Sequence, residues 1–294
     1  MDAFGLTNIG NTCYFNSMIQ SLLSCDELTR VMLSMKSNPK YQSNSVAWEY
    51  IKFLEGITGS GSTYPLEAGA GNIWRAIVSY LGAIGKHKYF GHGQEDTHES
   101  FCMLMECWEN LTEVVELFNH IEQVRVFCLS CKGWVLKKES APTSYFQITP
   151  HMQVYISDEL KSKVEIKSEE LVDPLANIIR KKIAQLDSYV CPTCKSNQPK
   201  IECTILRYVP KILIVLCNKY EEKIMVNFPE QMTISDYKYQ VVSQIIHYGS
   251  TGGGHYIARS KRKSGWYELN DSSPSKISGY QPDQGTYVVF YERV

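Results

Sequence analysis

Cys13 is the first residue whose type and surroundings could support nucleophilic catalysis. It follows the segment NIGNT at 8–12 and opens a stretch whose apolar residues recur at helical spacing. A helix N-terminus favours the reactive thiolate, because its free N–H groups and positive dipole end stabilise negative charge. Asn11 or Thr12 could cap this helix, and the Asn8 amide is a donor of the kind that stabilises an oxyanion. In this local context alone, a small buried hydrophobic residue is the commoner role for such a cysteine.

A candidate general base lies near the other end of the chain. His255 follows three glycines and precedes β-type residues, and Asn270 and Asp271 follow from 15 residues later. On neighbouring strands of a hairpin, the polar side chain would orient the imidazole and fix its tautomer, as thiol proteases require. Each residue also has an ordinary structural explanation: turn glycines, a core histidine and a turn-forming pair. A cysteine with a distant histidine and an Asn or Asp is therefore a weak pattern by itself.

Four of the ten cysteines form two Cys-x-x-Cys pairs, Cys128 with Cys131 and Cys191 with Cys194. Four thiolates from two such turns suit tetrahedral Zn²⁺, and a site closed by four sulfurs leaves no coordination position open for chemistry. The sequence therefore predicts a structural zinc site and no cofactor for catalysis. The alternative is four reduced thiols without a metal.

The composition excludes several function classes. The 294 residues carry 30 basic and 31 acidic side chains, a balance that gives no electrostatic basis for binding nucleic acid or an anionic membrane. The basic run at 261–263 is interpreted as a solvated hairpin tip. The longest aliphatic stretch, 212–217, is far shorter than the roughly 20 residues of a membrane span, and the N-terminus has no signal-peptide pattern. We expect an intracellular protein, cytoplasmic and/or nuclear.

The elements that must position these residues change in character near residue 121. Before it, apolar residues recur at helical spacing at 15–23, 46–54, 73–81 and 101–111. After it, one predicted helix at 173–186 interrupts a series of β-rich runs. These runs lie at 124–127, 134–136, 145–148, 154–156, 201–208, 211–216, 237–248 and 287–291. Helices first and strands later favour an α+β fold over a doubly wound sheet.

Longer motifs around these candidates resemble those of the ubiquitin-specific protease family. The resembling segments are the cysteine box at 5–17, the internal Gln-Glu-Asp motif at 94–99, the histidine box at 247–249, 254–256 and 266–271, and the strands at 210–220 and 287–291. The motifs are long, and they stand in the family's order. The resemblance covers nearly the whole chain.

This resemblance implies a papain-like cysteine protease fold in a single catalytic domain, residues 1–294. Its parts would be a helical thumb at 1–121, zinc-binding fingers at 122–205 and a β-rich palm at 206–294. The implied activity is thiol-dependent hydrolysis of the isopeptide or peptide bond after the C-terminal Gly-Gly of ubiquitin, through an acyl-enzyme on Cys13. The expected partners are ubiquitin and ubiquitinated proteins, and the expected state is a monomer.

Carried over by position, the resemblance gives each candidate a role. Cys13 is the nucleophile, His255 the general base and acid, and Asn270 the third member of the triad. Asn8 is the oxyanion donor, and the adjacent Asp271 would share the orienting or oxyanion-supporting role. The residues expected along the channel for ubiquitin's tail are Asp96, His98, Glu99, Tyr220 and Tyr256.

Asp96 has two expected functions. Its carboxylate can form a charge-assisted pair with ubiquitin's basic tail. With Glu99 three residues later, it can also begin the helix that follows as a capping box. Both are compatible, because one carboxylate has two oxygens; His98 and Glu99 would otherwise be solvated first-turn residues. Two departures from the family's pattern, at Ser100 and Pro274, touch no triad member.

Two alternatives remain open from the sequence. A protease for another Gly-Gly-ended ubiquitin-like modifier would carry the same motifs, because they mainly recognise the tail. A non-catalytic, zinc-containing scaffold that binds ubiquitin would be expected to lack a triad member, and all three are present. The chain begins at the cysteine box and stops after the last matched strand, so we expect a minimal enzyme or an excised catalytic domain.

Overall fold

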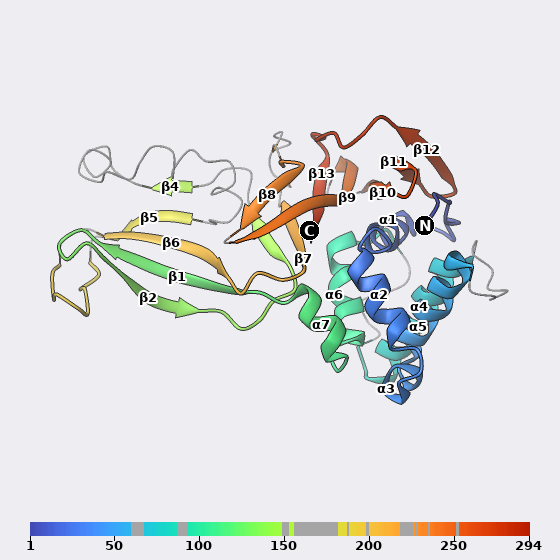
Figure 1. The fold of residues 1–294 in the computed structure, drawn as a ribbon, viewed down its shortest axis with the longest axis horizontal. Coiled ribbons are helices and arrows are strands. Elements are labelled where there is room, and N and C mark those ends of the chain that lie inside the picture. Colours follow the sequence, from blue (N-terminus) through green and yellow to red (C-terminus); the bar gives the residue numbers. More distant parts are fainter. Residues whose placement is uncertain are drawn as a thin grey trace.

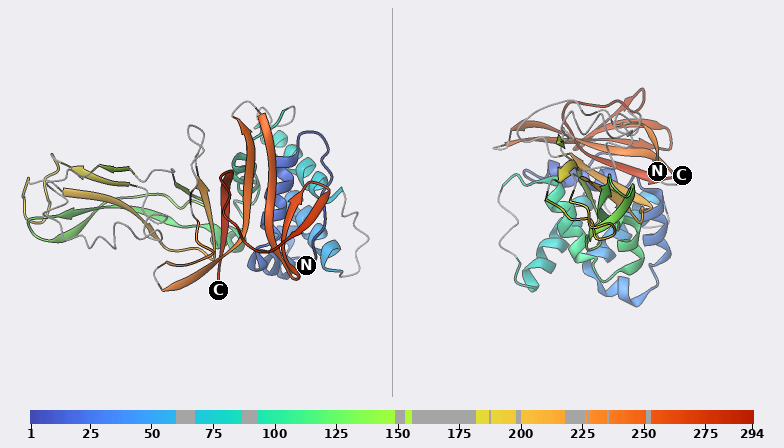
Figure 2. Two further views of the ribbon diagram at one scale, coloured as in Figure 1. Left: turned by 90° about the horizontal axis from the view of Figure 1, so that it is seen from above. Right: turned by 90° about the vertical axis from the view of Figure 1, so that its left-hand side faces the viewer.

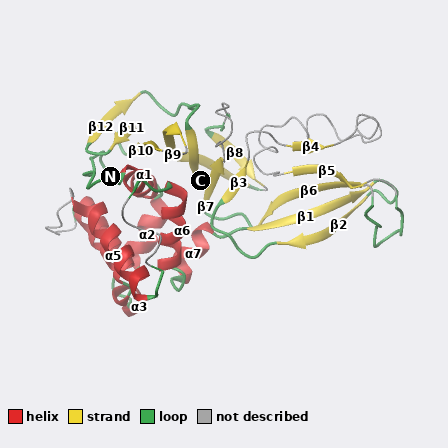
Figure 3. Ribbon diagram, turned by 180° about the vertical axis from the view of Figure 1, so that it is seen from behind, coloured by secondary structure: helices red, strands yellow, loops and turns green. Residues whose placement is uncertain are grey.

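The computed structural model describes residues 1–59, 68–86, 93–148, 153–155, 182–186, 188–197, 200–217, 226, 228–234, 236–250 and 253–294. In this part of the chain, the helices form one layer, an eight-stranded sheet covers them, and a five-stranded sheet extends away from both (Figure 1). Figure 3, which colours helices red and strands yellow, shows the helices gathered on one side of the strands. The predicted α+β arrangement is confirmed. No helix among the described residues combines the length and apolar character needed to cross a membrane.

The helical layer comes from the N-terminal part of the chain. Its helices are α1 (Cys13–Leu22), α2 (Asp26–Ser34), α3 (Pro39–Ser43), α4 (Ser45–Thr58), α5 (Gly69–Ala83), α6 (Thr97–Cys107) and α7 (Thr112–Phe118). Asparagine side chains fix two helix starts: Asn38 accepts the N–H of Lys40 at α3, and Asn44 accepts that of Ala47 at α4. The four predicted helical stretches correspond to α1, α4, α5 and α6. The short helices α2, α3 and α7 add to them.

The eight-stranded sheet is antiparallel except for one pair. Its strands are β3 (Phe146–Ile148), β7 (Ile212–Cys217), β8 (Gln231–Ile234), β9 (Tyr237–Ser250), β10 (Gly253–Arg262), β11 (Gly265–Asn270), β12 (Ser273–Ile277) and β13 (Thr286–Arg293). The spatial order is β12-β11-β10-β9-β13-β7-β3, with β8 paired to β9 and β3 parallel to β7. Figure 2 shows this sheet lying across the helices as a second layer.

The five-stranded sheet has the order β2-β1-β6-β5-β4. Its strands are β1 (Ile121–Cys128), β2 (Gly133–Glu139), β4 (Gln153–Tyr155), β5 (Lys182–Leu186) and β6 (Lys200–Arg207). The helix predicted at 173–186 is wrong for its last five residues, which form β5; the rest lies outside the described residues. Residues of β5 pair with β6, and this strand pairing overrides the local helical spacing.

Helix α1 is buried along its whole length between the helical layer and the sheet. All ten of its residues are buried, so the helix contacts the rest of the protein on all sides and not only along the single apolar face that the periodicity predicts. Its polar residues have partners: Ser21 Oγ donates to the Ser17 carbonyl, and Ser243 Oγ on β9 donates to Ser21 Oγ over 2.9 Å. Cys13 therefore begins an element that is held on all sides.

Arg262, at the end of β10, closes the other end of α1. Its guanidinium donates to the Gln20 carbonyl over 3.0 Å, to Gln20 Oε1 over 2.6 Å and to Ser24 Oγ. The interpretation of 261–263 as a solvated tip is wrong for Arg262, which is 5% exposed, and holds for Lys261 and Lys263. Burial lowers the pKa of Arg262 to about 10, yet it stays cationic and faces the negative dipole end of α1.

We expect Arg262→Met to destabilise the protein by about 2 kcal/mol, because the Gln20 carbonyl and amide oxygens lose a buried donor. Lys261→Met, at the exposed neighbour, should change stability by less than about 0.5 kcal/mol. Urea unfolding of both variants measures the difference. Equal midpoints would show that Arg262 does not hold the end of α1.

Candidate active site and metal site

Cys13 is the first residue of α1, and its side chain is buried. Helix α1 packs against β10, the strand that carries His255. The expected cap by Asn11 or Thr12 is wrong, because no side chain caps α1. Thr12 Oγ1 instead accepts the Ile9 N–H and donates to Asn8 Oδ1. The positive end of the helix therefore faces Cys13 without a side-chain acceptor in front of it.

His255 and Asn270 lie on adjacent strands, as their spacing predicts. His255 Nε2 is 2.8 Å from Asn270 Oδ1, and β10 and β11 form an antiparallel hairpin. This contact occupies the Nε2 nitrogen of the ring and leaves the Nδ1 nitrogen available for proton transfer.

Glycine is required directly before the histidine. A Cβ on Gly254 would lie 2.3 Å from His247 Nε2 and 2.5 Å from the Tyr248 carbonyl oxygen, both on the paired strand β9. Strands β9 and β10 therefore approach more closely here than a larger residue allows. The His255 backbone is placed by that close approach.

Asp271 makes a different set of contacts from its neighbour Asn270. Its carboxylate accepts from Asn8 Nδ2 over 3.0 Å and from Asn16 Nδ2 over 2.7 Å, and its carbonyl accepts the Leu6 N–H over 2.8 Å. Asp271 has a φ of 47°, which turns its side chain away from the one before it. Asn270 thus bonds to the histidine, and Asp271 bonds to the loop that precedes Cys13.

Asn8 is held at both ends of its side-chain amide. Its Oδ1 accepts the N–H groups of Gly10 and Thr12, and one Nδ2 hydrogen goes to Asp271. An amide nitrogen carries two hydrogens, so the second can still bind an oxyanion. Asn16 is a supporting residue that sequence reasoning misses; its signal is a polar residue one helical turn after Cys13.

Gln94 is the second residue that sequence reasoning misses as part of this site. The sequence shows it only as the start of a motif, yet its Nε2 donates to Cys13 Sγ over 3.7 Å. Cys13 and His255, both in the described part of the chain, make no hydrogen bond with each other. The sulfur is in contact with Gln94 instead.

The expected tail-binding residues occupy the start of α6 and its neighbours. Asp96 Oδ1 accepts the N–H groups of His98 and Glu99, which confirms the cap, and Asp96 Oδ2 accepts from Tyr287 Oη over 2.7 Å. Tyr256 is buried, with its ring 4.5 Å from that of His247. Tyr220 lies outside the described residues.

His98 is packed rather than solvated. Its Nε2 is 3.4 Å from Cys102 Sγ, and its ring meets the Tyr145 ring edge-on at 4.1 Å. Burial lowers the pKa of His98, so the ring is neutral near pH 7. Glu99 is exposed in the first turn of α6, as expected, and partial burial together with Asp96 raises its pKa.

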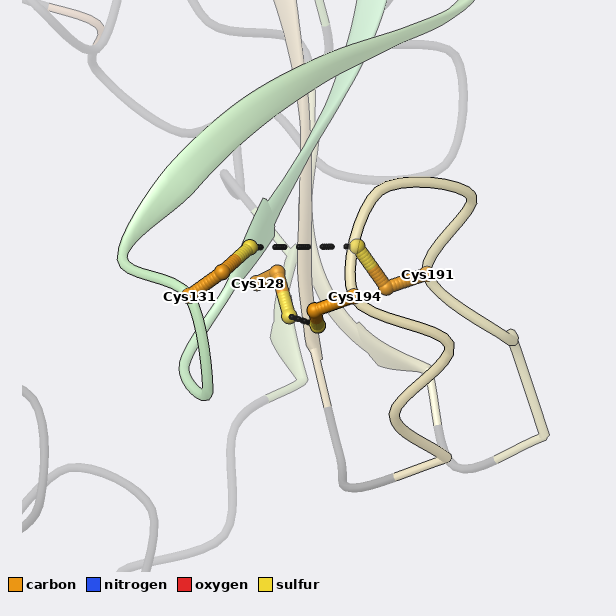
Figure 4. A group of neighbouring side chains, drawn as sticks. All are labelled: Cys128, Cys131, Cys191 and Cys194. Atoms are coloured by element: carbon orange, nitrogen blue, oxygen red, sulfur yellow. Dashed lines mark hydrogen bonds between the residues drawn. The ribbon is translucent and has the colours of Figure 1, made fainter.

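The four cysteines of the two Cys-x-x-Cys pairs meet at the far tip of the five-stranded sheet (Figures 1 and 4). All four sulfurs lie within 4.8 Å of one another, with Cys128 3.6 Å from Cys194 and Cys131 3.9 Å from Cys191. These are free thiols. A Zn²⁺ with four Zn–S bonds of about 2.3 Å in a tetrahedron needs sulfurs about 3.8 Å apart, so this cluster could bind zinc.

Comparison with known proteins places these features in a family. The chain is 25% identical to human ubiquitin carboxyl-terminal hydrolase 42 over 328 residues, covering 98% of this chain and 23% of that protein. It is 23% identical to the probable ubiquitin carboxyl-terminal hydrolase 16 of Schizosaccharomyces pombe, covering 99% of this chain and 67% of that protein. The chain thus spans less than a quarter of the human relative.

Solved structures share the fold. The SAGA Ubp8/Sgf11/Sus1/Sgf73 DUB module bound to ubiquitin aldehyde matches with a TM-score of 0.72 at 19% identity, over 99% of this chain and 70% of that one. This likeness confirms the predicted papain-like protease fold. The family model described as "Ubiquitin carboxyl-terminal hydrolase" matches residues 4–291, and the chain therefore belongs to the ubiquitin carboxyl-terminal hydrolase family.

Proposed function

We propose that this chain is a cysteine deubiquitinase, which hydrolyses the isopeptide or peptide bond after the C-terminal Gly-Gly of ubiquitin. One observation carries the proposal: two polar pairs are tied to the start of the helix that begins at Cys13. Asp271, the partner of Asn8, bonds to Asn16 of that helix, and Gln94 links the Cys13 sulfur to Gly254, the neighbour of the His255 that pairs with Asn270. Family membership supports ubiquitin as the substrate, and so does the ubiquitin aldehyde bound to the DUB module that shares this fold.

In the proposed acylation step, the Cys13 thiolate attacks the carbonyl carbon of the last glycine. His255 takes the thiol proton on Nδ1, since Nε2 is bonded to Asn270, and then gives it to the departing amine as the C–N bond breaks. A thioester remains on Cys13. Water then attacks that thioester with His255 as the base, releasing the ubiquitin carboxylate and the thiol.

Negative charge develops on the carbonyl oxygen in both steps. We assign its stabilisation to the free Nδ2 hydrogen of Asn8 and to the N–H groups at the start of α1. Asp271 and Asn16 would position Asn8 rather than touch the substrate, because their contacts run through one another and the loop before Cys13.

Asp96 is the proposed contact for the basic tail. Both of its oxygens have a partner, but a carboxylate has about four acceptor sites, so an arginine can still bind it. Glu99, exposed one turn later, can add negative charge. The contacts of His98 with Cys102 and Tyr145 favour a packing role for His98. Tyr256 would act as a wall of the channel.

We propose that the four cysteines hold a structural Zn²⁺. Backbone N–H groups of Cys194 and Thr193 lower the pKa of Cys191, which favours the thiolate that a metal requires. When bound, the ion would tie the turn after β1 to the segment at 188–197. It would take no part in hydrolysis, because four protein sulfurs complete its coordination.

We expect the chain to hydrolyse a fluorogenic amide at the C-terminus of ubiquitin, and Cys13→Ala to reduce turnover to background. The matched control is Cys107→Ala: burial raises the pKa of Cys107 to about 12, so this thiol is not a nucleophile. Loss of turnover in both variants, or in neither, would contradict the assignment. Faster cleavage of another Gly-Gly-ended modifier would identify that modifier as the substrate. Ubiquitin binding without turnover would favour the non-catalytic scaffold.

Double-mutant cycles should show that Asn270 and Asp271 act through different residues. Asn8→Ala and Asp271→Ala should each lower kcat by about 10²-fold, and the double variant should lose little more than Asn8→Ala alone, because Asp271 acts through Asn8. Combined with Asn270→Ala, the loss from Asn8→Ala should instead multiply, because Asn270 acts on His255. Multiplicative losses in both pairs would disprove the division of roles.

Purified protein should contain a single zinc ion per chain, measured by elemental analysis. Cys191→Ala should remove nearly all of it and lower the thermal unfolding midpoint, since metal binding is coupled to folding of the site. Cys107→Ala should retain the zinc. A metal content that does not change with Cys191→Ala would exclude this cluster as the site.

A further inference from the structure

We infer that Gln94 is a positioning residue, which anchors the strand bearing His255 beside the helix bearing Cys13 and donates a hydrogen bond to the Cys13 sulfur. The inference rests on the proposed roles of Cys13 and His255. It assigns a function to a residue that precedes the cap of α6 and belongs to neither strand nor helix.

The anchor is a two-point contact between one side chain and one backbone residue. Gln94 Oε1 accepts the Gly254 N–H over 2.8 Å, and Gln94 Nε2 donates to the Gly254 carbonyl. An adjacent strand would make the same pair of bonds. Here the neighbour β11 pairs with β10 only at 258–262, so a side-chain amide occupies the strand edge that β11 leaves uncovered at Gly254.

The same amide reaches the reactive sulfur. Gln94 Nε2 is 3.7 Å from Cys13 Sγ, and its two hydrogens allow it to serve the Gly254 carbonyl and the sulfur together. Donation to the sulfur stabilises the thiolate relative to the thiol. A single neutral side chain therefore joins the start of α1, the start of β10 and the segment before α6.

Placement of Gly254 has a direct effect on the chemistry, because His255 follows it. Strand β9 restrains Gly254 from one side, where a Cβ has no room, and Gln94 restrains it from the other. A displacement of about 1 Å between reacting groups can cost about 10²-fold in rate. We therefore expect removal of the anchor to lower kcat more than it raises KM.

The test uses Gln94→Glu and Gln94→Met in the full chain. Glutamate has the same shape but cannot donate to the sulfur and places a negative charge beside it; methionine removes both contacts at similar length. Two measurements are made: the pH dependence of Cys13 alkylation by iodoacetamide, followed by peptide mass spectrometry, and the kinetics of ubiquitin amide hydrolysis. Gln42→Glu, which places the same charge on the distant helix α3, is the matched control.

Gln94→Glu should move the midpoint of Cys13 alkylation upward by roughly one pH unit, and both Gln94 variants should lower kcat by about 10²-fold. Gln42→Glu should match the wild type in both. An unchanged alkylation midpoint in Gln94→Glu would overturn the inference, and so would faster hydrolysis by Gln94→Met, which would show that Gln94 obstructs the sulfur. Alkylation needs no ubiquitin. A shifted midpoint in a chain without hydrolysis would therefore refute the proposed function and still support the contact with the sulfur.

Discussion

The burial of α1 is the constraint on which the rest of the structure depends. Both layers of the fold pack around this helix, so its axis cannot tilt without opening the core. Arg262 donates to the carbonyl and side-chain amide oxygens of Gln20 at the C-terminal end of α1, while the N-terminal end of the helix has no side-chain cap. The helix therefore presents its positive end and Cys13 at a fixed place. The same thiol on a loop would have neither the dipole nor the rigidity.

Three chain segments that are distant in sequence meet at this fixed end. The loop before α1 brings Asn8, the hairpin β10–β11 brings His255, and the segment before α6 brings Gln94. Amide side chains make most of the connections between them. Amides donate and accept without carrying charge, so they can crowd a sulfur and an imidazole without the desolvation cost of further ions. The one carboxylate in this network, Asp271, accepts from two amides.

The sequence predicts what local pattern encodes. Helical spacing places Cys13 at a helix start, and the spacing of His255 and Asn270 predicts their hairpin contact. The limits of thumb, fingers and palm stay predictions. What the sequence could not show depends on long-range geometry. The role of Gln94 requires knowing that the pairing of β11 with β10 stops at Ala258 and leaves Gly254 without a partner from β11. The strand β5 escapes prediction because its spacing fits a helix equally well and only its pairing with β6 decides.

The five-stranded sheet, which carries the cysteine cluster, contributes few of its described residues to the apolar core. Among the described residues, both apolar core clusters lie in the helices and the eight-stranded sheet, and the five-stranded sheet contributes only Leu206. On β2, Trp134 and Leu136 are each 53% exposed. The described side chains of this sheet therefore add little to the apolar core, and they gain little from the hydrophobic effect. A metal bound between two turns at its tip would supply a cross-link far from α1 and β10, so the stability of the five-stranded sheet and the reactivity of Cys13 can be set separately.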